Sequence, residues 1–81
     1  TLEIYQYEHI EKQDAVSPNK RGFGHIAFEV ENVESILDSL KRNGGTVFGE
    51  ITKRTIKDVG EITFVYERDP EGNLIELQSW Q

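Results

Sequence analysis

The stretch Gly22-Phe-Gly-His-Ile-Ala-Phe-Glu-Val30 decides how the rest of the chain is interpreted. From Phe23 to Val30 it is typical of a β-strand, because apolar and β-prone residues dominate and no helical spacing is present. Since side chains alternate along a strand, its residues divide between two faces. An aliphatic face holds Ile26, Phe28 and Val30, and the opposite face holds His25, Ala27 and Glu29. The aliphatic face is expected to pack against a helix.

That helix is predicted directly after the strand. Asn32 is a good N-cap, because its side-chain oxygen can accept a hydrogen bond from the first turn. The apolar residues that follow have helical spacing, namely Val33, Ile36, Leu37 and Leu40. Lys41 and Arg42 suit the helix C-terminus, and Gly44 can supply the left-handed residue that ends it.

Further strands are predicted on both sides of this unit. Three follow the helix: Thr46 to Thr55 with a break near Gly49, Glu61 to Arg68, and Leu74 to Trp80. Asp69-Pro-Glu-Gly-Asn73 is typical of a tight turn between the last two. Before the unit, Thr1 to Tyr7 alternates like a strand, and Glu8 to Arg21 is interpreted as a linker. The predicted order is one strand and then β-α-β-β-β.

The last strand carries the second polar residue that needs an explanation. Ile75 and Leu77 share the aliphatic face, whereas Glu76 lies opposite, with Gln78 and Trp80. Alternation places Glu3, His25 and Glu76 on the same side of the sheet. A carboxylate or imidazolium that is buried without a partner costs several kcal/mol of folding free energy, on the order of ionic desolvation penalties. A divalent metal between imidazole and carboxylate would offset that cost. A hydrogen-bonded sheet histidine is the alternative.

Composition narrows the possible classes of protein. The 81 residues, with a net charge of −6, are expected to form one small domain. Nucleic acid is an unsuitable partner, because no dense basic cluster larger than a pair such as Lys53-Arg54 is present. No membrane span or signal peptide is predicted, and the absence of cysteine fits a cytoplasmic setting. Because the chain starts at Thr1 inside a strand-like run, we expect it to be part of a longer polypeptide.

Three motifs in this order resemble one known superfamily. They are the stretch from Gly22 to Val30, Asn43-Gly-Gly45, and Asp69-Pro-Glu-Gly-Asn-Leu-Ile-Glu-Leu77. Together they are similar to the C-terminal βαβββ module of the vicinal oxygen chelate superfamily. Its members include glyoxalase I, bleomycin-resistance proteins and extradiol dioxygenases. The resemblance implies an α+β fold, in which residues 22–81 form a curved mixed sheet with a helix on its convex face. Residues 1–7 resemble the closing strand of a preceding module, and residues 8–21 the linker.

The resemblance also implies a site. The family's strand histidine and last-strand glutamate bind a divalent metal, which carries over onto His25 and Glu76. Glu3 corresponds to a third ligand, and no residue here corresponds to the fourth. Arg21 in Arg21-Gly-Phe-Gly-His25 resembles the arginine that binds a glutathione carboxylate in glyoxalase I. Tyr7 stands near a position where that family has asparagine, and Tyr7 and Trp80 are candidates for substrate binding.

The expected function follows from this resemblance. It is a lyase or isomerase similar to glyoxalase I (lactoylglutathione lyase), which uses zinc, nickel, manganese or iron on a small substrate with vicinal oxygens. Glu76 and Glu3 are the candidates for proton transfer. A second module or chain, as in a homodimer, should complete the cavity. The alternatives are a metal-free resistance protein that binds a drug or metabolite, and a ring-cleaving extradiol dioxygenase.

Overall fold

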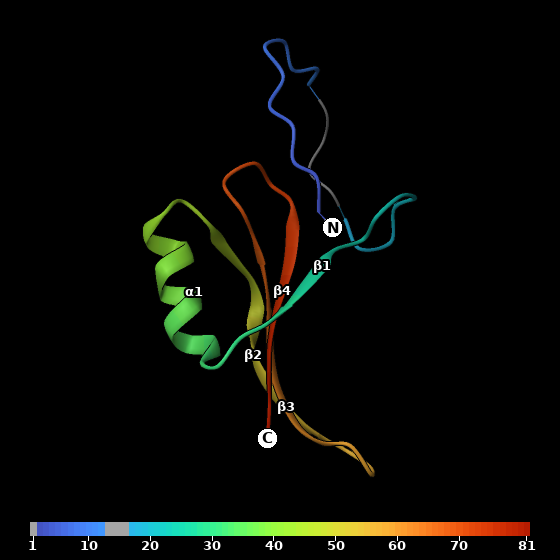
Figure 1. The fold of residues 1–81 in the computed structure, drawn as a ribbon, viewed down its shortest axis with the longest axis vertical. Helices are drawn as coiled ribbons and strands as arrows, with labels where there is room; N and C mark the ends of the chain where they lie inside the picture. Colours follow the sequence, from blue (N-terminus) through green and yellow to red (C-terminus); the bar gives the residue numbers. More distant parts are fainter. Residues whose placement is uncertain (1, 13–16) are drawn as a thin grey trace.

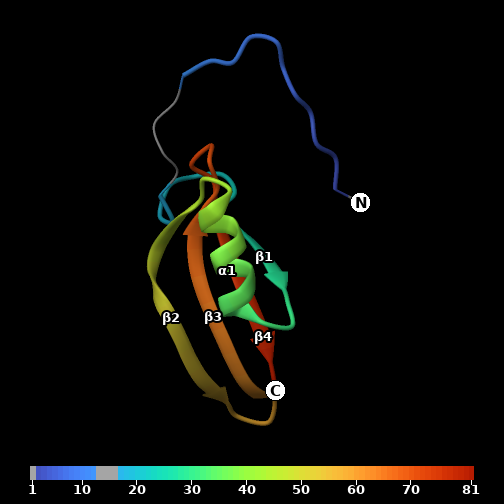
Figure 2. The same cartoon turned by 90° about the vertical axis from the view of Figure 1, so that its left-hand side faces the viewer.

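The computed structural model describes residues 2–12 and 17–81, which form one helix and a four-stranded sheet. The elements are β1 (Ile26–Glu29), α1 (Val33–Arg42), β2 (Thr46–Ile56), β3 (Gly60–Arg68) and β4 (Leu74–Trp80). The strand order is β1-β4-β3-β2, with β1 parallel to β4 and the other neighbours antiparallel. Figure 1 shows α1 along one side of the sheet, and Figure 2 shows the same helix in front of the strands. The predicted α+β fold with a mixed curved sheet is confirmed.

Helix α1 begins and ends where its sequence predicts. The Asn32 side chain accepts a hydrogen bond from the Ser35 amide at 2.9 Å, which satisfies one of the free N–H groups of the first turn. After the helix, Gly44 has a φ of 95°, a conformation that glycine adopts without steric cost. Within the described ranges, no helix has the length and apolar character that crossing a membrane requires.

The turn between β3 and β4 fixes where β4 begins. The Asp69 carboxylate accepts hydrogen bonds from the backbone amides of Glu71 (3.0 Å) and Asn73 (2.8 Å), and from the Asn73 side-chain amide (2.9 Å). Gly72 has a φ of 90°, so this position favours glycine. Because the turn has a fixed length, it sets the register of β4 on β3 and therefore the face on which each β4 side chain lies.

The core lies between α1 and the sheet. Val33 and Leu37 from the helix pack with Val65 of β3 and Leu77 of β4, and all four are at most 5% exposed. Partly buried apolar residues surround this cluster: Val30, Leu40, Ile51 and Ile75. The helix therefore covers one face of the sheet and leaves the other face uncovered by any described helix. We refer to the second face as the open face.

The structure shortens or lengthens the predicted strands at their ends. The first strand of the unit covers Ile26–Glu29 rather than Phe23 to Val30, because only these four residues pair with β4. β2 and β3 each gain one residue at the hairpin, where Ile56 pairs with Gly60. The break predicted near Gly49 is present as a shift of register between Phe48 and Thr52.

The N-terminal segment differs from the prediction. A strand was expected over Thr1 to Tyr7, but residues 2–7 have no regular structure, and Thr1 lies outside the described residues. Alternating apolar residues form a stable strand only when a neighbouring strand satisfies the backbone, and residues 2–7 pair with none of the four strands. Figures 1 and 2 show the segment outside the sheet. Leu2 and Ile4 are accordingly 64% and 84% exposed.

Candidate functional site

Register and alternation bring polar and aromatic side chains together on the open face. Glu76 of β4 pairs with Ala27 of β1 on one side and with Tyr66 of β3 on the other. Directly cross-strand residues share a face of the sheet, so the Glu76 side chain lies in a row with Tyr66. Gln78 lies in the next row, opposite Phe64. The open face is therefore polar along β4 and aromatic along β3.

His25 and Glu76 meet on this face, as the alternation predicted. His25 Nε2 lies 3.1 Å from Glu76 Oε1, within hydrogen-bonding distance, although the residues are 51 positions apart in the chain. The Glu76 residue is 8% exposed, whereas about a third of the His25 side chain remains accessible (34%). His25 therefore presents an accessible imidazole beside a nearly buried carboxylate.

Two further side chains extend this contact along β4. Gln78 Nε2 donates to Glu76 Oε2 at 2.6 Å, and Trp80 Nε1 donates to Gln78 Oε1 at 2.9 Å. Both Glu76 oxygens consequently have a protein partner. Hydrogen bonds from His25 and Gln78 thus offset part of the desolvation cost of Glu76 without an ion.

Tyr66 is a further side chain at the candidate site, and no sequence pattern predicted it. Its ring meets the His25 ring edge-on, with centroids 5.0 Å apart and an interplanar angle of 87°. Burial raises the pKa of the Tyr66 phenol above its usual value, and the neighbouring Glu76 raises it further through hydrogen bonding and charge. The phenol therefore stays protonated at neutral pH and can donate a hydrogen bond. Alternation over Glu61 to Arg68 places Tyr66 on one face with Phe64, but only the pairing of β3 with β4 sets it beside Glu76.

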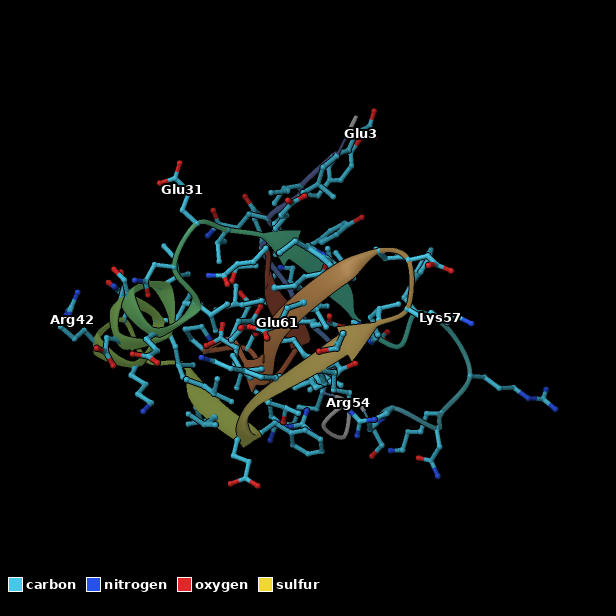
Figure 3. The ribbon with its side chains drawn as sticks, turned by 90° about the horizontal axis from the view of Figure 1, so that it is seen from below. Glu3, Glu31, Arg42, Arg54, Lys57 and Glu61 are labelled. Carbon is cyan, nitrogen blue, oxygen red and sulfur yellow. The ribbon has the colours of Figure 1, made fainter. Side chains whose placement is uncertain are left out.

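The structure does not bring the remaining candidates to this pair. Glu3 lies in the N-terminal segment, where its Oε2 accepts a hydrogen bond from the Tyr5 hydroxyl at 3.2 Å. Figure 3 shows Glu3 at the outer end of that segment, pointing away from the sheet. Tyr7 and Arg21 are exposed. Among residues 2–12 and 17–81, no three His, Cys, Asp or Glu side chains are grouped so that they could hold a metal ion. The roles of Glu3, Tyr7 and Arg21 stay predictions.

The His25–Glu76 pair has the donor atoms that a divalent metal requires. Imidazole nitrogen and carboxylate oxygen bind ions such as Zn²⁺ at roughly 2.0–2.2 Å, so two ligand atoms on one ion lie about 3 Å apart. The observed separation of 3.1 Å fits this arrangement. The pair therefore fits a metal as two of its ligands. The described residues do not supply the others.

An apolar hollow adjoins His25. It has a volume of about 480 Å³ and lies between the N-terminal segment, the start of β1 and the turn before β4. Its lining includes Leu2, Ile4, Phe23, His25, Ile26 and Leu74. His25 therefore borders both the open face and this apolar space.

Comparisons with known proteins agree with the fold. A glyoxalase family protein from Bacillus cereus has a TM-score of 0.69 and 24% identity, over 89% of this chain and 46% of that one. An integron cassette protein from the mobile metagenome of V. cholerae has a TM-score of 0.52 and 34% identity, over 70% of this chain and 44% of that one. This chain thus spans less than half the length of either structure. No curated protein matches it.

A family profile covers nearly the whole chain. Residues 2–77 match the profile described as Glyoxalase/Bleomycin resistance protein/Dioxygenase superfamily. The match includes both His25 and Glu76. The chain belongs to the glyoxalase/bleomycin resistance protein/dioxygenase superfamily.

Proposed function

We propose that this module supplies half of a metal-dependent lyase or isomerase site of the glyoxalase I type, which acts on a small substrate with vicinal oxygens. The observation that carries the proposal is the 3.1 Å approach of His25 Nε2 to Glu76 Oε1 on the open face. An accessible imidazole beside a carboxylate is the donor set that zinc, nickel, manganese or iron prefers. A bound ion would supply Lewis acidity toward the two substrate oxygens.

The protein side of the chemistry belongs to His25, Glu76 and Tyr66. Neutral His25 would be a ligand through Nε2, and the edge of the Tyr66 ring restricts the orientation of its imidazole. Glu76 is the group that we expect to accept and return a substrate proton, because a carboxylate can act as a general base. The protonated phenol of Tyr66 provides a hydrogen-bond donor beside that carboxylate.

A second module would complete the site. Two ligands are fewer than a divalent ion usually takes from a protein. The B. cereus and V. cholerae structures are more than twice as long as the part of them that this chain covers. We propose that the missing ligands come from another module, in the same polypeptide or in a homodimer. Glu3 would join them if the N-terminal segment pairs with that module, and Arg21 and Tyr7 would then be placed to bind glutathione.

A metal-free binding protein is the second candidate function. The observation that favours it is the hydrogen bonding of Glu76, whose two oxygens already have partners in His25 and Gln78. In this case the open face and the apolar hollow would hold a drug or metabolite, and His25 and Trp80 would contact it.

The test is the metal content of the purified full-length protein and of its His25→Ala variant. We expect the parent protein to contain about one Zn²⁺ for each complete site. His25→Ala should reduce the affinity by more than the roughly 10–100-fold that the loss of an outer-shell partner costs. His9→Ala is the matched control, because His9 is the other histidine of this sequence and is exposed in the region interpreted as a linker. Turnover of a hemithioacetal would support the glyoxalase type. Negligible metal in parent and variant alike would contradict the enzyme proposal and favour the binding protein.

A further inference from the structure

Three consecutive open-face residues of β4 form a hydrogen-bonded series that ends on Glu76. Trp80 Nε1 donates to Gln78 Oε1 at 2.9 Å, and Gln78 Nε2 donates to Glu76 Oε2 at 2.6 Å. Residues two apart on a strand point to the same face and lie about 7 Å apart, a gap that glutamine and tryptophan side chains can bridge. We call these three residues the β4 relay.

The hydrogen bonds of the β4 relay can be donated in only one direction, from Trp80 toward Glu76. The indole nitrogen of Trp80 is a donor and never an acceptor, so the Gln78 group that faces it must be the carbonyl oxygen. The amide NH₂ of Gln78 must then point the other way, toward Glu76. An ionised carboxylate only accepts, so the NH₂ group and Glu76 Oε2 are complementary. Trp80 therefore fixes the orientation of an amide that could otherwise rotate by half a turn.

The relay also determines which oxygen of Glu76 a ligand can reach. Oε2 is held by Gln78, whereas Oε1 faces the accessible imidazole of His25. We propose that Gln78 and Trp80 are positioning residues, which hold Glu76 so that a ligand at the site meets Oε1 alone. The role of the relay toward a bound ion rests on the proposed function, but the orientation of Glu76 does not. The N–H group of Trp80 thus has its partner within the protein, and the role of the Trp80 ring in substrate binding stays a prediction.

All members of the relay lie on one strand. Its geometry consequently depends on β4 itself and on the antiparallel register with β3, in which Glu76, Gln78 and Trp80 face Tyr66, Phe64 and Ile62. It does not depend on the N-terminal segment or on a second module. The same relay should therefore be present in the full-length protein.

The first test is the indole N–H signal of Trp80 in the NMR spectrum of the metal-free full-length protein, identified by its loss in Trp80→Phe. Gln78→Leu removes the acceptor and keeps a similar volume. It should shift this signal toward that of a solvent-exposed indole and speed its hydrogen exchange by roughly two- to tenfold, the factor expected for one hydrogen bond. Ser79→Ala is the control, because Ser79 lies between Gln78 and Trp80 in the sequence but on the opposite face of the sheet. An unchanged indole signal in Gln78→Leu would overturn the relay.

The second test is Zn²⁺ affinity, measured by competition with a chromophoric chelator. Gln78→Leu should weaken binding by about 10–100-fold, as outer-shell partners do, and Trp80→Phe should weaken it less. Ser79→Ala should bind as the parent does. If the parent binds no Zn²⁺, the metal-dependent function fails, and the indole signal alone then decides whether the relay exists. If Zn²⁺ binds the parent and Gln78→Leu equally, the positioning role is wrong even though the metal function stands.

Discussion

Glu67→Leu is expected to stabilise the protein at neutral pH by about 1–3 kcal/mol, the usual cost of a buried polar group without a partner. Glu67 lies on the helix-facing side of β3 and is completely buried (0% exposed). Its cross-strand neighbours are Val47 of β2 and Ile75 of β4, which are both apolar. Neither carboxyl oxygen has a hydrogen-bond partner within the described part of the chain. Leucine has a similar volume and leaves no polar atom in this position.

The effect of Glu67 on stability should depend on pH. Burial raises the pKa of the Glu67 carboxyl above its usual value, and the charge of Asp69 raises it further. Below the unfolded-state pKa of 4.5 the group is protonated in both states and adds no pH dependence. As the pH rises above that value, the unfolded chain releases the proton first, so the folded state loses stability until the raised pKa is passed. The slope of this loss cannot exceed about 1.4 kcal/mol per pH unit for one group.

Denaturant unfolding of parent and variant across this pH range measures both effects. The stability difference between Glu67→Leu and the parent should widen as the pH rises from 4.5 and then become constant. Glu61→Leu is the matched control, because Glu61 is on the same strand but exposed, and it should change stability by less than about 0.5 kcal/mol. A difference that stays the same at every pH would mean that Glu67 titrates normally in the folded protein.

Alternation predicted that His25 and Glu76 lie on one face because a sheet has a strict period of two. His25 and Glu76 each interrupt an apolar run. Glu76 lies in β4 and His25 lies directly before β1, and the pairing of β1 with β4 brings the two side chains together. Tyr66 was missed for a different reason. A tyrosine in a strand is ordinary, so only its cross-strand position beside Glu76 gives it a role, and a single sequence does not state which strands are neighbours.

Glu67 and residues 2–7 show two features that alternation alone does not predict. Glutamate is rarely buried without a partner, so sequence patterning gave no reason to place Glu67 in the core. For residues 2–7 the alternating pattern was present, but a strand also needs a neighbouring strand with free backbone groups. Residues 2–7 pair with none of the four strands, so the predicted pattern did not become a strand. Alternation therefore predicts the face of the strand on which a side chain lies, but it does not predict which strand or helix contacts that side chain.

Leu77→Ala is expected to destabilise the protein by about 2–5 kcal/mol, the usual range for removing a buried leucine side chain. Leu77 is 2% exposed and contacts the cluster formed with Val33, Leu37 and Val65. These side chains lie between the helix and the sheet, so the cavity that Leu77→Ala leaves would lie between α1 and β4. Domains have a total stability of roughly 5–15 kcal/mol, and this loss is a large part of it. The measurement is the free energy of unfolding in denaturant, with Leu77→Met as the volume-conserving control that should cost less than about 1.5 kcal/mol.

Comparison with the neighbouring substitution tests whether the two faces of β4 have separate roles. Leu77 faces the helix, whereas Gln78 faces the open side and donates to Glu76. Leu77→Ala should lower the free energy of unfolding but leave the Zn²⁺ affinity of the folded protein near that of the parent. Gln78→Leu should weaken Zn²⁺ binding and lower the free energy of unfolding by less, because it removes two hydrogen bonds, one partly buried and one exposed, and no core contact. Each such bond contributes roughly 0.5–1.5 kcal/mol. If Leu77→Ala weakened Zn²⁺ binding as much as Gln78→Leu at a temperature where both are folded, the site would depend on core packing rather than on the relay.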